Sequence, residues 1–207
     1  QLKEVITFNV PYEFIEIKED MIISSNNNLN QSKEEIINKA FNFHSKGNIN
    51  EALIFYEYII NQGFHDHRVY SNYGAILKDK KRLKEAESSL YKAIEMKPNF
   101  AEAYSNLGNI LLELGKLKEA ELSTRKAIEI DPDCANAHSN LGIILKDLGQ
   151  LKESELSLRK AIELKPAFAD AYSNLGLVFR DLGKLQEAES STRKAIQINP
   201  DCANTHS

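Results

Sequence analysis

Apolar residues in the stretch 101–134 recur at intervals of three and four positions, which is the spacing of a helix with one buried face. They form two sets, Tyr104, Leu107, Ile110, Leu111 and Leu114, then Leu117, Ala120, Thr124, Ala127, Ile128 and Ile130. Gly115 lies between the sets, where it can end a helix in the left-handed conformation, and Pro132 stops the second set. The stretch therefore predicts two helices joined by a tight turn.

The same pattern returns along the chain with a period of 34 residues, which indicates a stack of similar supersecondary units. The predicted units are 33–66, 67–100, 101–134, 135–168 and 169–202. The first unit is divergent, as expected at the end of a stack. Ser32 and Glu35 form a capping box, so the first helix of this unit is expected to begin near Lys33.

Both ends of the chain fall outside these units. Residues 1–32 do not match the repeat, and we expect an arm or linker that is extended in part, because apolar and polar residues alternate from Ile6 to Phe14. Residues 203–207 resemble the opening of the unit 135–168. They predict the start of a truncated further unit and a parent protein that continues.

Small residues recur where the two helices of a unit should cross. Glycine costs about 1 kcal/mol relative to alanine inside a helix, yet it occupies the first helix at Gly74, Gly108, Gly142 and Gly176. The facing position of the second helix is also small, at Ala86, Ala120 and Ala188. This pattern predicts a close crossing, and Ser154 is expected to loosen its unit slightly. Polar residues after the prolines are expected to cap the next helix, at Asn99, Asp133 and Asp201.

Charge and cysteine content narrow the classes of partner and compartment. The net charge of −4 comes from 26 basic and 30 acidic residues without a block of one sign, which argues against a nucleic-acid partner. No apolar run is long enough to span a membrane, so a soluble protein is expected. Cys134 and Cys202 hold equivalent positions two units apart, too far for a disulfide. Free thiols in a reducing, cytoplasmic compartment are predicted.

The sequence contains no catalytic motif, so no catalytic residue, metal or cofactor is predicted, and this segment is not expected to be an enzyme. The activity of the full-length parent stays open. His65, Asp66 and His67 form a local cluster, but adjacent residues in a loop favour a solvated turn over a metal site. Oppositely charged residues four positions apart predict a self-neutralised outer face at Glu121 and Arg125, Glu155 and Arg159, and Glu189 and Arg193.

The spacing of one set of residues resembles the tetratricopeptide repeat: Tyr104, Leu107, Gly108, Leu111, Ala120, Thr124, Ala127 and Pro132. Tyr or His takes the position that is usually Trp in this family. The resemblance covers residues 33–202. It implies an all-α solenoid of the bacterial type, a right-handed superhelix of antiparallel helix pairs.

The resemblance also implies a concave groove lined by the first helices, where a peptide binds. Mapped onto this chain, the groove residues are Arg68, Ser71, Asn72, Lys78, Ser105, Asn106, Asn109, Ser139, Asn140, Lys146, Ser173, Asn174 and Arg180. The asparagine column resembles the ladder in the superhelix of O-linked N-acetylglucosamine transferases, where amides can pair with a peptide backbone. Alternatively, these asparagines form hydrogen bonds between repeats and stiffen the stack.

The leading functional hypothesis is a scaffold that binds a protein or peptide partner of unknown identity. One alternative is the substrate-recruiting region of a larger modifying enzyme, such as a glycosyltransferase. Another is end-to-end self-association through the last helix near Ala188, Thr192 and Ala195. Capture of a chaperone tail is not expected, because Ser105 stands where chaperone-binding members of the family carry a lysine.

Overall fold

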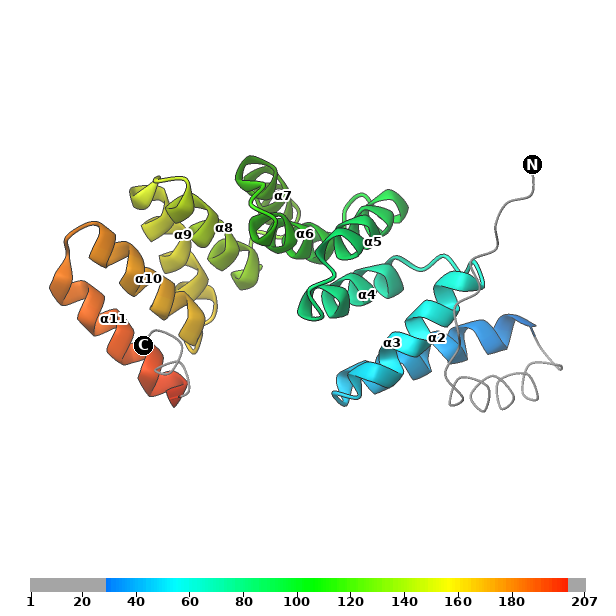
Figure 1. Cartoon of the computed structure of the whole chain (residues 1–207). Coiled ribbons are helices and arrows are strands. Elements are labelled where there is room, and N and C mark those ends of the chain that lie inside the picture. Colours follow the sequence, from blue (N-terminus) through cyan, green and yellow to red (C-terminus); the bar gives the residue numbers. More distant parts are fainter. Residues whose placement is uncertain (1–28, 201–207) are drawn as a thin grey trace. The chain divides into compact units, whose positions relative to one another are not determined.

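The computed structural model describes residues 29–200, and within this range the chain forms ten helices and no strand (Figure 1). The chain divides into two compact units, and the boundary along the sequence falls between His65 and Asp66. The helices are α2 (Leu29–Ser45), α3 (Ile49–Asn61), α4 (His67–Asp79), α5 (Leu83–Met96), α6 (Ala101–Glu113), α7 (Leu117–Ile130), α8 (Ala135–Asp147), α9 (Leu151–Leu164), α10 (Ala169–Asp181) and α11 (Leu185–Ile198).

The first unit contains the helix pair α2 and α3. Its buried residues are Ile37, Ala40, Ala52, Phe55, Tyr56 and Ile59. Helix α2 begins at Leu29, so the predicted start near Lys33 is wrong and Ser32 lies inside the helix. The segment from Leu29 to Gln31 contains neither glycine nor proline, and nothing in it stops the helix at the capping box.

The second unit is a row of four helix pairs that follow the predicted units from residue 67 onward. The turn within each pair has the predicted left-handed residue, with φ of +74° at Gly115, +76° at Gly149 and +75° at Gly183. The N–H groups of Gly115 and Lys116 donate to the carbonyl oxygens of Leu112 and Leu111, at 2.9 and 2.8 Å. This pattern of bonds is a Schellman motif, which satisfies the last carbonyls of the helix.

The close crossing within each pair is confirmed. A Cβ added to Gly142 would lie 2.5 Å from Cγ of the buried Leu158, and one added to Gly74 would lie 3.0 Å from Cγ of Leu90. At the position where the sequence predicts a slightly looser pair, Ser154 forms a hydrogen bond that alanine cannot form. It is fully buried, and its hydroxyl donates to the carbonyl oxygen of Gly142 at 2.5 Å.

The predicted helix caps at Asn99 and Asp133 are wrong. The N-cap residues of α6 and α8 are Phe100 and Cys134, and neither side chain accepts a capping hydrogen bond. The turn after each proline is one residue longer than expected, so the polar residue lies outside the helix. A cap is instead found at Asp66, whose Oδ1 accepts hydrogen bonds from the N–H groups of Arg68 and Val69.

The helices of the second unit form two layers. The first helices of neighbouring pairs contact each other, α4 with α6, α6 with α8 and α8 with α10. Each second helix contacts the first helix of the next pair, as α7 contacts α8. The main core cluster lies between the layers and includes Leu77, Leu90, Leu107, Ile110, Leu111 and Ile144. This arrangement places the first helices side by side on one face and the second helices on the other.

Candidate functional site

Each first helix of the second unit presents one stripe of four residues to solvent. The stripe holds the second, sixth, ninth and thirteenth positions of the repeat, which share a face because they are three or four residues apart. In all four helices the outer two residues of the stripe are exposed and the inner two are half-buried. We call these stripes the ladder face: Arg68, Asn72, Ala75 and Asp79; Glu102, Asn106, Asn109 and Glu113; Asn136, Asn140, Ile143 and Asp147; Asp170, Asn174, Leu177 and Asp181.

The predicted asparagine column occupies the half-buried sixth position of this face. Asn140 is 3.4 Å from the carbonyl oxygen of Ser105 and 3.5 Å from its hydroxyl, both measured from Nδ2. These distances lie beyond the usual range for an N–H donor, so the bonds are weak. The side chains of Asn72, Asn106 and Asn174 form no hydrogen bond with any residue in the described part of the chain. The alternative role in stiffening the stack therefore rests on one weak contact.

The predicted serine column lies deeper than the asparagines. The exposed fractions of Ser71, Ser105 and Ser139 are only 0%, 5% and 3%, whereas Ser173 is half-buried. The contact between Asn140 and Ser105 shows that this position faces the next first helix. The three buried hydroxyls therefore offer little surface to a ligand. Among the described residues, Ser71 Oγ is a buried side-chain oxygen without a hydrogen-bond partner.

The predicted cations of the groove are already paired with acids. Arg68 binds Asp66 at 2.6 Å, and Lys146 binds Asp147 at 2.9 Å. Longer contacts join Lys78 to Asp79 at 3.5 Å and Arg180 to Asp181 at 3.7 Å. Asn109, in contrast, is half-buried and its side chain forms no hydrogen bond within residues 29–200. The polar groups of the ladder face that stay available are thus mainly amides.

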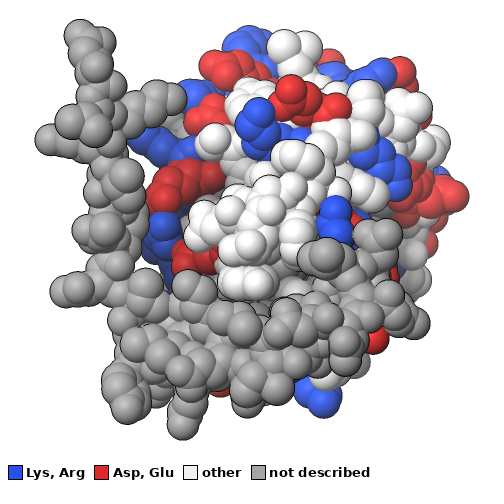
Figure 2. All heavy atoms as spheres, turned by 90° about the vertical axis from the view of Figure 1, so that its right-hand side faces the viewer, with Lys and Arg blue, Asp and Glu red and all other residues white. Residues whose placement is uncertain are grey.

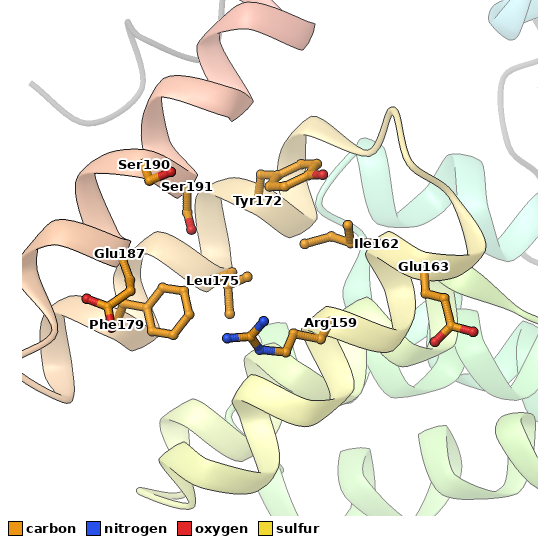
Figure 3. Close-up of a pocket in the computed structure, with 9 residues that line it drawn as sticks. All are labelled: Arg159, Ile162, Glu163, Tyr172, Leu175, Phe179, Glu187, Ser190 and Ser191. Atoms are coloured by element: carbon orange, nitrogen blue, oxygen red, sulfur yellow. The ribbon is translucent and has the colours of Figure 1, made fainter.

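The second helices form hollows that the sequence analysis missed. One hollow of about 500 Å³ lies among α9, α10 and α11, where Arg159 extends toward Phe179 and Leu175 (Figure 3). A second hollow of about 450 Å³ has equivalent residues 34 positions earlier, Arg125, Ile128, Glu129, His138 and Leu141. The sequence does contain a signal for an apolar surface on the second helices, because leucine recurs at the same position of two units. Leu122 and Leu156 are 70% and 68% exposed on the second helices.

The outer face is self-neutralised, as predicted. The pairs Glu121–Arg125, Glu155–Arg159 and Glu189–Arg193 have N–O distances of 3.0, 2.9 and 2.6 Å. Further ion pairs join neighbouring repeats, Lys116 with Glu87 at 2.7 Å and Lys184 with Glu155 at 2.9 Å. The hydrogen bond from Lys184 is the main cause that lowers the pKa of Glu155. Figure 2 shows a different side of the molecule, the right-hand side of Figure 1, where acidic and basic side chains also lie among each other.

The remaining predicted features have the following positions. Among residues 29–200, no three His, Cys, Asp or Glu side chains are grouped so as to hold a metal ion, and no helix is long and apolar enough to cross a membrane. Cys134 is a half-buried free thiol, whereas Cys202 and Asp201 lie outside the described residues. Residues 1–28 of the predicted arm and the predicted further unit at 203–207 also lie outside them, and residues 29–32 of the arm belong to α2. Of the residues proposed for self-association, Thr192 is exposed, Ala188 is half-buried and Ala195 is buried.

Two family models match the second unit of the chain. The model described as "Tetratricopeptide repeat" matches residues 101–134 and 169–202, and the model described as "TPR repeat" matches residues 74–115 and 144–183. Together these matches span residues 74–134 and 144–202, more than half of the chain. No curated protein matches the chain.

Several solved structures have a similar fold and cover most of the chain, including MamA, YrrB and TTC0263. MamA is 24% identical, with a TM-score of 0.64, over 79% of this chain and 96% of MamA. YrrB, described as a TPR protein with an unusual peptide-binding site, is 26% identical, with a TM-score of 0.61, over 80% of this chain and 86% of YrrB. TTC0263 from Thermus thermophilus is 19% identical, with a TM-score of 0.69, over 81% of this chain and 92% of TTC0263.

Proposed function

The chain belongs to the tetratricopeptide repeat family and is a protein-interaction scaffold, and we propose that it holds an extended peptide on the ladder face. The observation that carries this proposal is the column of asparagine amides, half-buried and largely without hydrogen-bond partners. An amide has both a donor and an acceptor, so it can pair with either group of a peptide backbone. Because every peptide has these groups, such a column grips a segment whatever its side chains are.

The neighbouring positions support a division of roles on this face. The sixth position is asparagine in all four helices, whereas the ninth position changes from Ala75 through Asn109 and Ile143 to Leu177. Constant amides next to varied side chains fit backbone binding combined with side-chain selection. The likeness to YrrB supports the same use, because that protein is described as having a peptide-binding site.

A selection experiment tests this proposal without knowledge of the partner. A display library of random 12-residue peptides is selected on the immobilised chain, and the strongest peptide is synthesised for measurement of Kd by fluorescence anisotropy. The triple variant Asn106→Ala, Asn140→Ala and Asn174→Ala is expected to raise Kd by about tenfold or more, because each lost hydrogen bond contributes about 0.5–1.5 kcal/mol. Circular dichroism should show unchanged helix content.

The matched control has Arg125→Ala, Arg159→Ala and Arg193→Ala, which change the outer face of the same repeats. Arg159 and Arg125 line the two hollows described above, and Arg193 lines a further hollow of about 490 Å³ on α10 and α11. Unchanged Kd in the control and weaker binding in the asparagine variant support the ladder face. Weaker binding in the control and unchanged Kd in the asparagine variant would indicate that the peptide binds at the outer hollows. A library that yields no binding peptide would also contradict the proposal.

Self-association is a second candidate because α11 carries exposed apolar residues. Leu185 and Ile196 are 68% and 38% exposed, whereas their equivalents in α9, Leu151 and Ile162, are half-buried by the next pair. Sedimentation velocity over a range of concentrations tests this candidate. Assembly predicts a sedimentation coefficient that rises with concentration and falls in the variant Leu185→Lys, and a constant monomer value contradicts it.

A further inference from the structure

The ladder face carries many more acids than cations. Among its residues the one cation is Arg68, which is paired with Asp66, because Lys78, Lys146 and Arg180 of the predicted groove lie beside the face, at the twelfth position. Its acids are Asp79, Glu102, Glu113, Asp147, Asp170 and Asp181. The excess of negative charge is local, because basic and acidic residues of the whole chain nearly balance, at 26 and 30.

Ion pairs separate these acids into two groups. The acids at the thirteenth position are paired with cations beside the ladder face, as Lys146 pairs with Asp147 and Lys81 with Glu113, both at 2.9 Å. Glu102 and Asp170, at the second position, are exposed and form no ion pair or hydrogen bond within the described residues. The free charges of the ladder face are therefore two carboxylates, on α6 and α10.

The apolar part of this face lies at its end toward α10. Ile143 and Leu177 take the ninth position of two helices that contact each other, and both are half-buried. Each follows an asparagine of the column by three residues, Asn140 and Asn174, so it lies on the same side of its helix. A peptide bound by these two amides would therefore have apolar surface beside it, with Asp170 on the same helix as Leu177.

We propose that the occupant of the ladder face is a basic extended peptide, with apolar side chains on Ile143 and Leu177 and Lys or Arg side chains opposite Glu102 and Asp170. This inference rests on the proposed function and adds the chemistry of the partner. Neighbouring packed helices are about 8–10 Å apart, so two carboxylates on α6 and α10 are separated by roughly 16–20 Å. An extended chain advances about 3.3 Å per residue, which spaces the two basic residues about five or six positions apart.

The charges also make an acidic peptide a poor fit. A partner carboxylate could bind Lys146 or Arg180 only in competition with Asp147 or Asp181, which already contact them. It would also lie near Glu102 and Asp170, which have no ion-pair partner within the described residues, and like charges repel. A basic side chain meets no such competitor at the second position.

The test compares peptides selected by the wild type and by a charge-reversed variant, Glu102→Lys with Asp170→Lys. The same random 12-residue display library is used, and the composition of the selected peptides is read by sequencing. The wild type is expected to enrich Lys and Arg, and the variant is expected to lose this enrichment and favour Asp and Glu. A selected basic peptide should bind Asp170→Asn about two- to fivefold more weakly than wild type, as for an exposed ion pair.

The matched control is Glu119→Lys with Glu187→Lys. These exposed acids are also two repeats apart, but they lie on the second helices α7 and α11. The control should select the same basic peptides as the wild type. Equal composition in all three selections, or enrichment of acidic peptides by the wild type, overturns the inference.

The two proposals fail in different ways. If selected peptides lose binding in the triple asparagine variant but show no basic enrichment, the peptide site stands and the charge preference is wrong. If they bind that variant as tightly as the wild type, the ladder face is not the site and both proposals are wrong.

Discussion

The hydroxyl of Ser154 donates a hydrogen bond of 2.5 Å to the carbonyl oxygen of Gly142 and so joins α9 to α8. The other three pairs of the second unit have alanine at the position of Ser154, namely Ala86, Ala120 and Ala188. Ser154 is fully buried, and an unpaired hydroxyl there would be costly. The serine is therefore an additional link between the two helices, in the pair where the sequence indicated a weak point.

Ser154→Ala is expected to lower the stability of the chain by about 1 kcal/mol, the net contribution of one hydrogen bond. The urea midpoint, followed by circular dichroism, measures the change. Ser157→Ala is the control, because Ser157 is half-buried on the same helix and its hydroxyl forms no hydrogen bond within residues 29–200. A higher midpoint for Ser154→Ala than for wild type would mean that the serine does loosen its pair.

Gly142→Ala is expected to destabilise the α8 and α9 pair by about 1 kcal/mol. Overpacking against Leu158 costs about 1–3 kcal/mol, and the better helix propensity of alanine returns about 1 kcal/mol. The contact itself is tested by Leu158→Ala, which removes the atoms that the new Cβ would meet. The double variant should lose less stability than the sum of the single variants, and strict additivity contradicts the clash.

The features that sequence predicted well are those that depend on a few neighbouring residues. Gly115 and Gly149 mark turns because the left-handed conformation is a local property of the backbone. Gly142 marks the close crossing because its partner helix follows after a short turn. Because the sequence repeats every 34 residues, the same turns and crossings are predicted in each later pair of the stack.

The features that sequence did not predict depend on contacts between repeats. Ser105 looks like a surface residue in its own helix, and it is buried because α8 packs beside it. Lys116 and Glu87 are 29 positions apart and form an ion pair only because their repeats stack. The hollows of the second helices have the same origin, since each is lined by three helices from two repeats.

Lys81→Gly is expected to stabilise the chain by about 0.5–1 kcal/mol. Lys81 has a φ of +61°, which a residue with a Cβ adopts at a cost, and the equivalent turns have glycine. The substitution also removes the pair with Glu113, but the Lys81 side chain is 75% exposed and such pairs contribute little. Thermal unfolding measures the change. Lys81→Ala keeps the strain and loses the pair, so it should not raise the melting temperature, and an equal increase in both variants would exclude backbone strain as the cause.

Glu155→Gln is expected to lower stability at pH 7 and to have little effect near pH 3. Lys184 and Arg159 hold the pKa of Glu155 below its ordinary value of 4.5, with the hydrogen bond from Lys184 as the largest cause. The ionised carboxylate therefore stabilises the folded state above about pH 4.5, and this contribution is lost as the pH falls through the lowered pKa.

Urea midpoints of the wild type and Glu155→Gln between pH 7 and pH 3 should converge as the pH falls. Glu189→Gln is the control, because Glu189 pairs with Arg193 of its own helix and is 64% exposed. Its effect should be small throughout, as for other exposed pairs. A constant difference between Glu155→Gln and wild type over this range would show that the link between α9 and the start of α11 is packing rather than charge.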